Sequence, residues 1–177
     1  MKIITGGQTG VDTGALLAAE DCGAEWQAIM PRRLRREKLA PDWMVNGGVF
    51  GDPVLELPTL AYDKRTERCV YITDAVLIVA PAGNLSPGTR LTIELAKRYG
   101  RSWHWLSGNY TEALTWLRGR LETNPKLTLM VAGPRESKWP TGELIAREAV
   151  SWLLTDGARD LRDTIRTDDV DSRHQIL

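Results

Sequence analysis

Residues 3–12 read Ile3-Ile4-Thr5-Gly6-Gly7-Gln8-Thr9-Gly10-Val11-Asp12 and join two different patterns. The apolar pair at the start indicates a buried strand, whereas the alanines and leucines of residues 15–19 indicate a helix. Glycines at such a junction allow positive φ angles and a close approach of the backbone to a ligand. The helix that follows exposes N–H groups and the positive end of its dipole, which attract anions such as phosphate. An ordinary strand-to-helix turn explains the pattern equally well, so alone it establishes no ligand site.

The composition is typical of a globular protein that is not strongly charged. The chain has 177 residues, 42% of them hydrophobic, which is enough for one domain with a substantial core. Its formal net charge is zero, so we expect neither nucleic acid nor a membrane surface as a partner. No apolar run approaches the ~20 residues of a membrane span, and no signal-peptide pattern opens the chain. Cys22 and Cys69 form no disulfide framework or zinc pattern, which favours a cytoplasmic protein.

Strand and helix patterns alternate along residues 1–154. Strands are expected over residues 24–30, 54–57, 75–80, 102–106 and 127–132, after the first one. Helices are expected over residues 12–21, 62–73, 89–99, 109–122 and 142–154, with Asp12 or Thr13 as the first N-cap. This alternation predicts an α/β fold, an open parallel sheet with helices on both faces. We expect a ligand-binding domain over residues 1–154 and a charged helix or tail over residues 155–177.

Three of the expected strand exits carry unusual residues, namely Thr5–Gly10, Gly83–Thr89 and Gly133–Ser137. In open α/β sheets, ligands bind beyond the carboxyl ends of the strands. We therefore expect these three segments to converge at one edge of the sheet, around a phosphate-bearing ligand.

Within these exits, single residues allow both a ligand role and a structural role. Gly88 and Thr89 open a helix and could hold a phosphate, or form an ordinary capping turn. Arg135 could grip a phosphate or carboxylate with its guanidinium, or pair with Glu136. Ser137 could contribute a hydroxyl to the ligand or cap the last helix.

Charged residues outside the exits have simpler explanations. Asp74 precedes its strand and lies ~20 Å from the carboxyl edge, so we expect a structural role. The basic run Arg32–Lys38 is interpreted as a solvated helix face rather than an anion-binding lid. Arg65 lies on a predicted helix, from which it could reach a neighbouring loop. Trp43 and Trp139 are the loop tryptophans that could stack on a base or a pterin.

Three segments, quoted in one-letter code, resemble the family named putative molybdenum carriers. They are IITGGQTGVDTGALLAA from residue 3, KRTERCV with TDAVLIVAPAGNLSPGTRLTIELAKRYG from residue 64, and LTLMVAGPRES from residue 127. That family is similar to a circularly permuted form of the Rossmannoid nucleotide-binding group, which includes the LOG phosphoribohydrolases and DNA-processing A proteins. The resemblance implies a circularly permuted Rossmann-like sheet, in which the strand before Gly133–Ser137 stands first in unpermuted relatives. It also implies a homo-oligomer that binds molybdenum cofactor or a nucleotide-like ligand.

Carried over position by position, the resemblance also implies a set of ligand-binding residues. They are Gly6, Gly7, Gln8, Thr9, Gly10, Asp12, Arg65, Thr66, Gly88, Thr89, Gly133, Arg135, Glu136 and Ser137. The phosphoribohydrolase relatives carry an acid three residues after the Gly-Thr threonine, a position that is Thr92 here. Glu94 stands two residues further along the helix, a rotation of about 200° that turns it away from the site. Residues 39–60 fit the family pattern poorly, so the resemblance does not choose the ligand.

These observations favour a protein that binds a phosphate-bearing, nucleotide-like or molybdopterin-type ligand without catalysis. One alternative stays open: a hydrolase of N-ribosidic or phosphoester bonds that uses Asp12 or Glu136 as its acid–base group. Another is an interaction module, in which Arg32–Lys38 and the charged tail bind a protein or nucleic acid. The sequence shows no Ser/His/Asp set and no metal-binding pattern.

Overall fold

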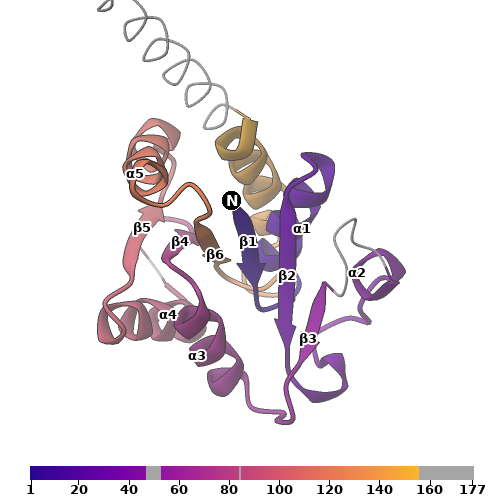
Figure 1. Cartoon of the computed structure of the whole chain (residues 1–177). Coiled ribbons are helices and arrows are strands. Elements are labelled where there is room, and N and C mark those ends of the chain that lie inside the picture. Colours follow the sequence, from indigo (N-terminus) through magenta and orange to yellow (C-terminus); the bar gives the residue numbers. More distant parts are fainter. Residues whose placement is uncertain (47–52, 84, 156–177) are drawn as a thin grey trace, which may run out of the picture.

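The computed structural model of the chain describes residues 1–46, 53–83 and 85–155, and Figure 1 shows their arrangement. Within these ranges the strands are β1 (Lys2–Thr5), β2 (Glu25–Met30), β3 (Val54–Glu56), β4 (Ala75–Val79), β5 (Ser102–Leu106) and β6 (Thr128–Ala132). The helices are α1 (Val11–Asp21), α2 (Asp42–Asn46), α3 (Tyr62–Ile72), α4 (Pro87–Arg98) and α5 (Tyr110–Thr123), with a 3-10 turn η1 (Arg32–Leu34). Residues 142–155 are also helical.

The described strands form one parallel sheet in the order β3-β2-β1-β6-β4-β5. The chain first adds β2 and β3 on one side of β1 and then crosses over to build β4 and β5. The last strand, β6, enters the middle of the sheet, so that Lys2 of β1 is in register with both Glu25 of β2 and Thr128 of β6. Strand order therefore reverses beside β1, and ligands of open α/β sheets bind at such a point. The predicted open parallel sheet is confirmed.

Helices cover both faces of this sheet, as expected. On β4, Leu77 and Val79 face one core cluster, which includes buried side chains of α1, α5 and the helix over residues 142–155. Val76 and Ile78 face the other cluster, to which α3 and α4 contribute Cys69, Val70, Leu95 and Ala96. β4 is thus buried along its whole length, which explains its uninterrupted apolar sequence.

The starts of two helices differ from the prediction. α1 begins at Val11, and its N-cap is Gly10, which has a φ of 78°. Neither Asp12 nor Thr13 is the N-cap. α4 begins at Pro87 rather than Thr89, because proline has the φ angle that suits a first helical residue. The N-cap of α4 is Ser86, whose side chain accepts the Thr89 N–H at 3.2 Å.

The prediction that Arg32–Lys38 forms a solvated helix face is wrong. Only η1 is helical there, and Arg33 and Leu34 have φ angles of 63° and 48°, which end any helix. The segment after η1 instead contacts the loops after β1 and β6, as described below. None of the described helices is long and apolar enough to cross a membrane. The predicted charged tail lies, apart from residue 155, outside the described residues.

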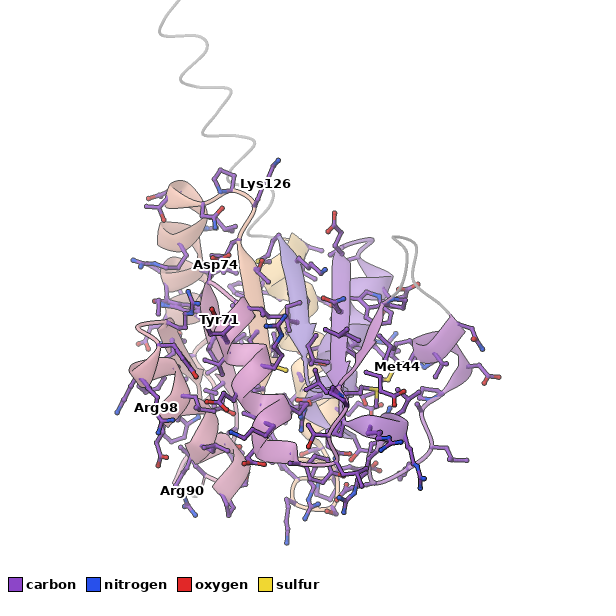
Figure 2. The ribbon with its side chains drawn as sticks, turned by 60° about the horizontal axis from the view of Figure 1, so that its bottom comes forward. Met44, Tyr71, Asp74, Arg90, Arg98 and Lys126 are labelled. Carbon is purple, nitrogen blue, oxygen red and sulfur yellow. The ribbon has the colours of Figure 1, made fainter. Side chains whose placement is uncertain are left out.

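Asp74 has the structural role expected from its position. Its Oδ2 accepts the Thr128 N–H at 2.8 Å and the Asn124 side-chain amide at 3.2 Å, which ties β4 to the start of β6. Figure 2 shows Asp74 and Lys126 at one end of the molecule and Arg90, from the first turn of α4, at the other. The amino ends of the strands are therefore remote from the edge where the strand exits lie.

Candidate functional site

A pocket of about 380 Å³ lies at the carboxyl edge of the sheet, a volume typical of small-molecule sites. The loop after β1, the start of α3, the start of α4 and the loop after β6 all contribute to its wall. Its lining residues are Gln8, Asp12, Tyr62, Asp63, Arg65, Thr66, Ser86, Pro87, Gly88, Leu91, Thr92, Met130, Ala132, Gly133, Arg135 and Lys138. The three strand exits predicted to converge therefore meet around one cavity.

A buried ion pair joins the loop after β1 to α3. Arg65 Nη1 lies 3.2 Å from Asp12 Oδ2, and the two side chains are only 11% and 8% exposed. The guanidinium passes directly over Gly6, where a Cβ would lie 0.9 Å from Arg65 Nη1. Burial raises the pKa of Asp12, while the Arg65 charge and the Gln8 N–H act in the opposite direction. Gly6 thus leaves the space in which Arg65 reaches Asp12, a contact with a neighbouring loop that the sequence allowed but did not require.

Gly10, a second glycine of this loop, lies in close contact with the backbone of the loop after β6. A Cβ on Gly10 would lie 2.7 Å from the Glu136 backbone nitrogen, and the φ of Gly10 is positive. The next residue, Val11, donates its N–H to the Pro134 carbonyl at 3.4 Å. Gly10 therefore lets the loops after β1 and β6 lie against each other.

The N-terminus of α4 forms an open part of the pocket wall. Gly88 is exposed, and apart from its chain neighbours and the backbone of its own helix, no described atom lies within 4 Å of the place that its Cβ would occupy. Thr89 is buried, its hydroxyl lies 2.9 Å from that of Ser86, and its N–H is already bound to Ser86. Thr92 donates its hydroxyl to the Gly88 carbonyl at 3.0 Å. Because Pro87 has no N–H, Gly88 is the first residue of α4 with an N–H that could meet a ligand.

The loop after β6 meets Glu37, a residue that the sequence did not single out. Arg135 Nε lies 3.0 Å from Glu37 Oε1, and Ser137 donates both its hydroxyl and its N–H to the same carboxylate. The Thr9 hydroxyl donates to it at 2.6 Å. Partial desolvation raises the pKa of Glu37, but the bonds from Ser137 and Thr9 and the charge of Arg135 outweigh this and lower it overall.

The alternative pairing of Arg135 with Glu136 is wrong, because Glu136 pairs with Lys38 at 2.6 Å. Glu37 could have been noticed in the sequence, because it is the one acidic residue within the basic run Arg32–Lys38. A lone acid in a basic run has no like-charged neighbours to repel and can be drawn to donors on another segment.

The residues matched through the resemblance fall into two groups. Those that line the pocket are Gln8, Asp12, Arg65, Thr66, Gly88, Gly133 and Arg135. Those outside its lining are Gly6, Gly7, Thr9, Gly10, Thr89, Glu136 and Ser137. The second group packs the loops or holds Glu37 and Lys38. The ligand-binding role of the first group stays a prediction.

Aromatic residues are placed differently from the sequence-based expectation. Trp43 packs edge-on against Trp26, with 6.0 Å between the ring centroids, and Trp139 packs beside Gly142. Neither lines the pocket. Tyr62, at the start of α3, does line it, with the Arg65 guanidinium 5.8 Å from its ring centroid. Helical periodicity alone could not identify Tyr62, because its exposure to the pocket depends on the packing of α3.

Two further observations concern possible metal ligands and Glu94. Within residues 1–46, 53–83 and 85–155, no group of three or more His, Cys, Asp or Glu side chains could hold a metal ion. Glu94 is exposed and does not line the pocket, as its position two residues after Thr92 predicted.

The parallel sheet and the pocket at its switch point define a Rossmann-like α/β protein with a cavity of small-molecule size. A family model described as the circularly permutated YpsA SLOG family matches residues 3–154, and the chain belongs to this family. The entry of β6, last in the chain, between β1 and β4 fits that permutation.

A solved crystal structure is also similar to this chain. The crystal structure named "Putative molybdenum carrier protein" from Syntrophus aciditrophicus matches with a TM-score of 0.71 and 29% sequence identity. The match covers 85% of this chain and 93% of that one. A comparison with curated proteins gave no match.

Proposed function

We propose that this protein binds a phosphate-bearing, nucleotide-like or molybdopterin-type molecule in the pocket, without turning it over. The observation that carries the proposal is the open N-terminus of α4 at Gly88, in the same pocket wall as Arg65, Arg135 and Lys138. α4 has 12 residues, so its dipole and its first N–H groups favour an anion there.

The charges around the pocket support an anionic ligand. The lining holds three cations, Arg65, Arg135 and Lys138, against two acids, Asp12 and Asp63. Asp12 is matched by Arg65, and no described acid pairs with Lys138. Arg135 is 46% exposed, so its guanidinium also has a solvent-facing part. A phosphate at Gly88 would therefore meet cations that can satisfy its charge.

The other part of the wall suits a ring. Tyr62, Leu91, Met130 and Ala132 give the pocket an apolar side that could hold a nucleobase or a pterin. The name of the Syntrophus structure, a molybdenum carrier, supports including molybdopterin among the ligands. When bound, molybdopterin would supply a dithiolene ligand for molybdenum, while this chain would hold its phosphate and its ring. A homo-oligomer in the cytoplasm belongs to the same proposal, and light scattering of the purified protein tests its assembly.

Binding is measured by calorimetry and thermal unfolding with AMP, GMP, ADP-ribose and molybdopterin. At a ligand concentration one hundred times the Kd, the stabilisation should approach about 2.7 kcal/mol. Gly88→Ala should weaken binding by at least about tenfold, because a methyl group would stand where the ligand meets the backbone. Gly119→Ala, on α5 and also with open space around its Cβ, is the matched control and should bind as the natural chain does. The proposal fails if none of the four compounds binds, or if Gly88→Ala binds them unchanged.

One observation favours hydrolysis as a second candidate. Asp12 lines the pocket, and burial raises its pKa against the opposing charge of Arg65, which is the direction that favours a general acid. Glu136, the other candidate acid, is outside the lining and paired with Lys38. Turnover of nucleoside monophosphates that is lost in Asp12→Asn, with binding retained, would establish this function in place of simple binding.

A further inference from the structure

The Glu37 carboxylate sits among donors that would suit a phosphate. It receives the Thr9 hydroxyl at 2.6 Å, the Ser137 N–H at 3.3 Å, the Ser137 hydroxyl and the Arg135 Nε at 3.0 Å. Two hydroxyls, a backbone N–H and a guanidinium are the groups that proteins use to hold phosphate oxygens. The Glu37 side chain is only 19% exposed. Although partial burial acts in the opposite direction, the bonds from Ser137 and Thr9 and the charge of Arg135 lower the pKa of Glu37.

The segment that carries Glu37 is held over the loops by polar contacts. We call residues 35–38 the strap. The Glu37 N–H donates to Gln8 Oε1 at 2.9 Å, Arg36 donates to the Thr13 hydroxyl at 2.9 Å, and Lys38 pairs with Glu136 on the surface. No residue of the strap belongs to either core cluster.

Backbone strain directly precedes the strap. Arg33 and Leu34 both adopt left-handed φ angles, which residues with a Cβ avoid and which are exceptional for a bulky side chain such as leucine. The strap therefore depends on its polar contacts to keep this position.

This donor cluster is continuous with the pocket. Arg135 lines the pocket and at the same time binds Glu37. Thr9 follows Gln8, which is also part of the pocket wall. A ligand that contacts Arg135 in the pocket would therefore meet the same side chain that holds the Glu37 carboxylate.

We propose that Thr9, Arg135 and Ser137 form an anion subsite for a phosphate group, and that Glu37 occupies it as an internal competitor which a ligand phosphate displaces. The competitor role rests on the proposed binding function, whereas the subsite itself does not. The strap is then a gate whose position depends on whether the subsite holds Glu37 or a phosphate. The opposing explanation is that Glu37 is only a clamp between two loops.

Inorganic phosphate separates these explanations without any nucleotide. Thermal unfolding is followed for the natural chain and for Glu37→Ala in rising phosphate, with chloride at equal ionic strength as the reference. Phosphate should bind Glu37→Ala at least about tenfold more tightly than the natural chain, because the donors have lost their internal acceptor. Adding Arg135→Gln to Glu37→Ala should abolish the difference.

Two further variants control this measurement. Asp21→Ala also removes a carboxylate paired with an arginine, Arg147 at 2.6 Å, but lies outside the site, so its phosphate response should equal that of the natural chain. Glu37→Gln keeps the shape of the side chain and replaces Glu37→Ala if that variant does not fold. An equal phosphate response in the natural chain and in the Glu37 variant would overturn the subsite and leave the clamp.

A second arm tests the competitor role with AMP. If AMP binds the natural chain, Glu37→Gln should bind it more tightly by several-fold, and unchanged affinity would overturn displacement of Glu37. If AMP, GMP, ADP-ribose and molybdopterin all fail to bind either chain, the proposed function and the competitor role both fail. The phosphate response of Glu37→Ala would still decide whether the subsite exists.

Discussion

Gly6→Ala should destabilise the protein through Arg65 rather than through the backbone. Gly6 does not adopt a left-handed φ, and the three closest atoms to its absent Cβ all belong to the end of the Arg65 side chain. An alanine methyl would therefore move the guanidinium aside at little steric cost. The consequence is that Asp12, 8% exposed, would lose the partner that lies 3.2 Å away.

The size of the effect follows from the two states open to Asp12. Leaving a buried charge without its partner costs about 3–5 kcal/mol. The carboxyl can instead take up a proton, which costs about 4 kcal/mol at pH 7 for a group with an ordinary pKa of 3.8. The cheaper state prevails, and alanine offsets part of the loss through lower entropy of the unfolded chain. Because burial already raises the pKa of Asp12 in the natural chain, we expect a net loss of at most about 3 kcal/mol at pH 7.

The loss should depend on pH. Burial raises the pKa of Asp12, so the folded chain holds this proton more tightly than the unfolded chain. The contribution of Asp12 to stability therefore falls as the pH rises through the range above 3.8, and Gly6→Ala strengthens this trend. At pH 5, protonating the carboxyl costs only about 2 kcal/mol, so the loss should be smaller there.

Urea unfolding at pH 5 and pH 7 measures these differences. Arg65→Ala should cost a similar amount, and Gly6→Ala should add less than about 0.5 kcal/mol to it, because the two variants remove the same interaction. Gly119→Ala, in open space on α5, should be neutral or stabilising by up to about 1 kcal/mol. The reasoning is refuted if Gly6→Ala is as stable as the natural chain at pH 7, or if its cost is undiminished without Arg65.

Three other predictions concern single contacts. Asp74→Ala should lower the free energy of unfolding by about 1 kcal/mol, because Thr128 and Asn124 lose their acceptor; unchanged urea midpoints would contradict this. Burial raises the pKa of the Cys69 thiol to about 12, so at pH 8 a thiol reagent should modify only Cys22 in the folded chain and both cysteines in urea. Ser86→Ala should cost about 1 kcal/mol in urea unfolding through loss of the α4 cap, and Ser86→Asp should restore it.

Most of the fold could be predicted because its signals are local. The uninterrupted apolar run of β4 required cover on both faces, and the Gly-rich turn after β1 required a strand that leads into a helix. The parallel arrangement then placed the strand exits at a common edge. The helix predicted over Arg32–Lys38 was wrong for a local reason. That run contains no proline or glycine, so nothing in its sequence indicates the left-handed φ angles of Arg33 and Leu34 that end the helix.

The candidate site was predictable only in outline. Gln8, Gly88 and Arg135 could be assigned to one edge because each follows the end of a strand or opens the helix behind one. Tyr62 and Glu37 could not, since their roles depend on how α3 and the strap pack against other segments. The partner of Arg135 was likewise undetermined, because a neighbour along the chain need not be the nearest carboxylate in space.

The amino-acid sequence by itself determined the alternation of strands and helices, the parallel sheet and the edge of the sheet at which the pocket lies. Those features follow from periodicity and turn residues, which act over a few neighbouring positions. Only the tertiary structure decided that Arg65 crosses Gly6 to reach Asp12, and that Glu37 fills the donors of Thr9, Arg135 and Ser137. Charges pair through space according to distance and burial, and these are set only when segments far apart in the chain are packed together.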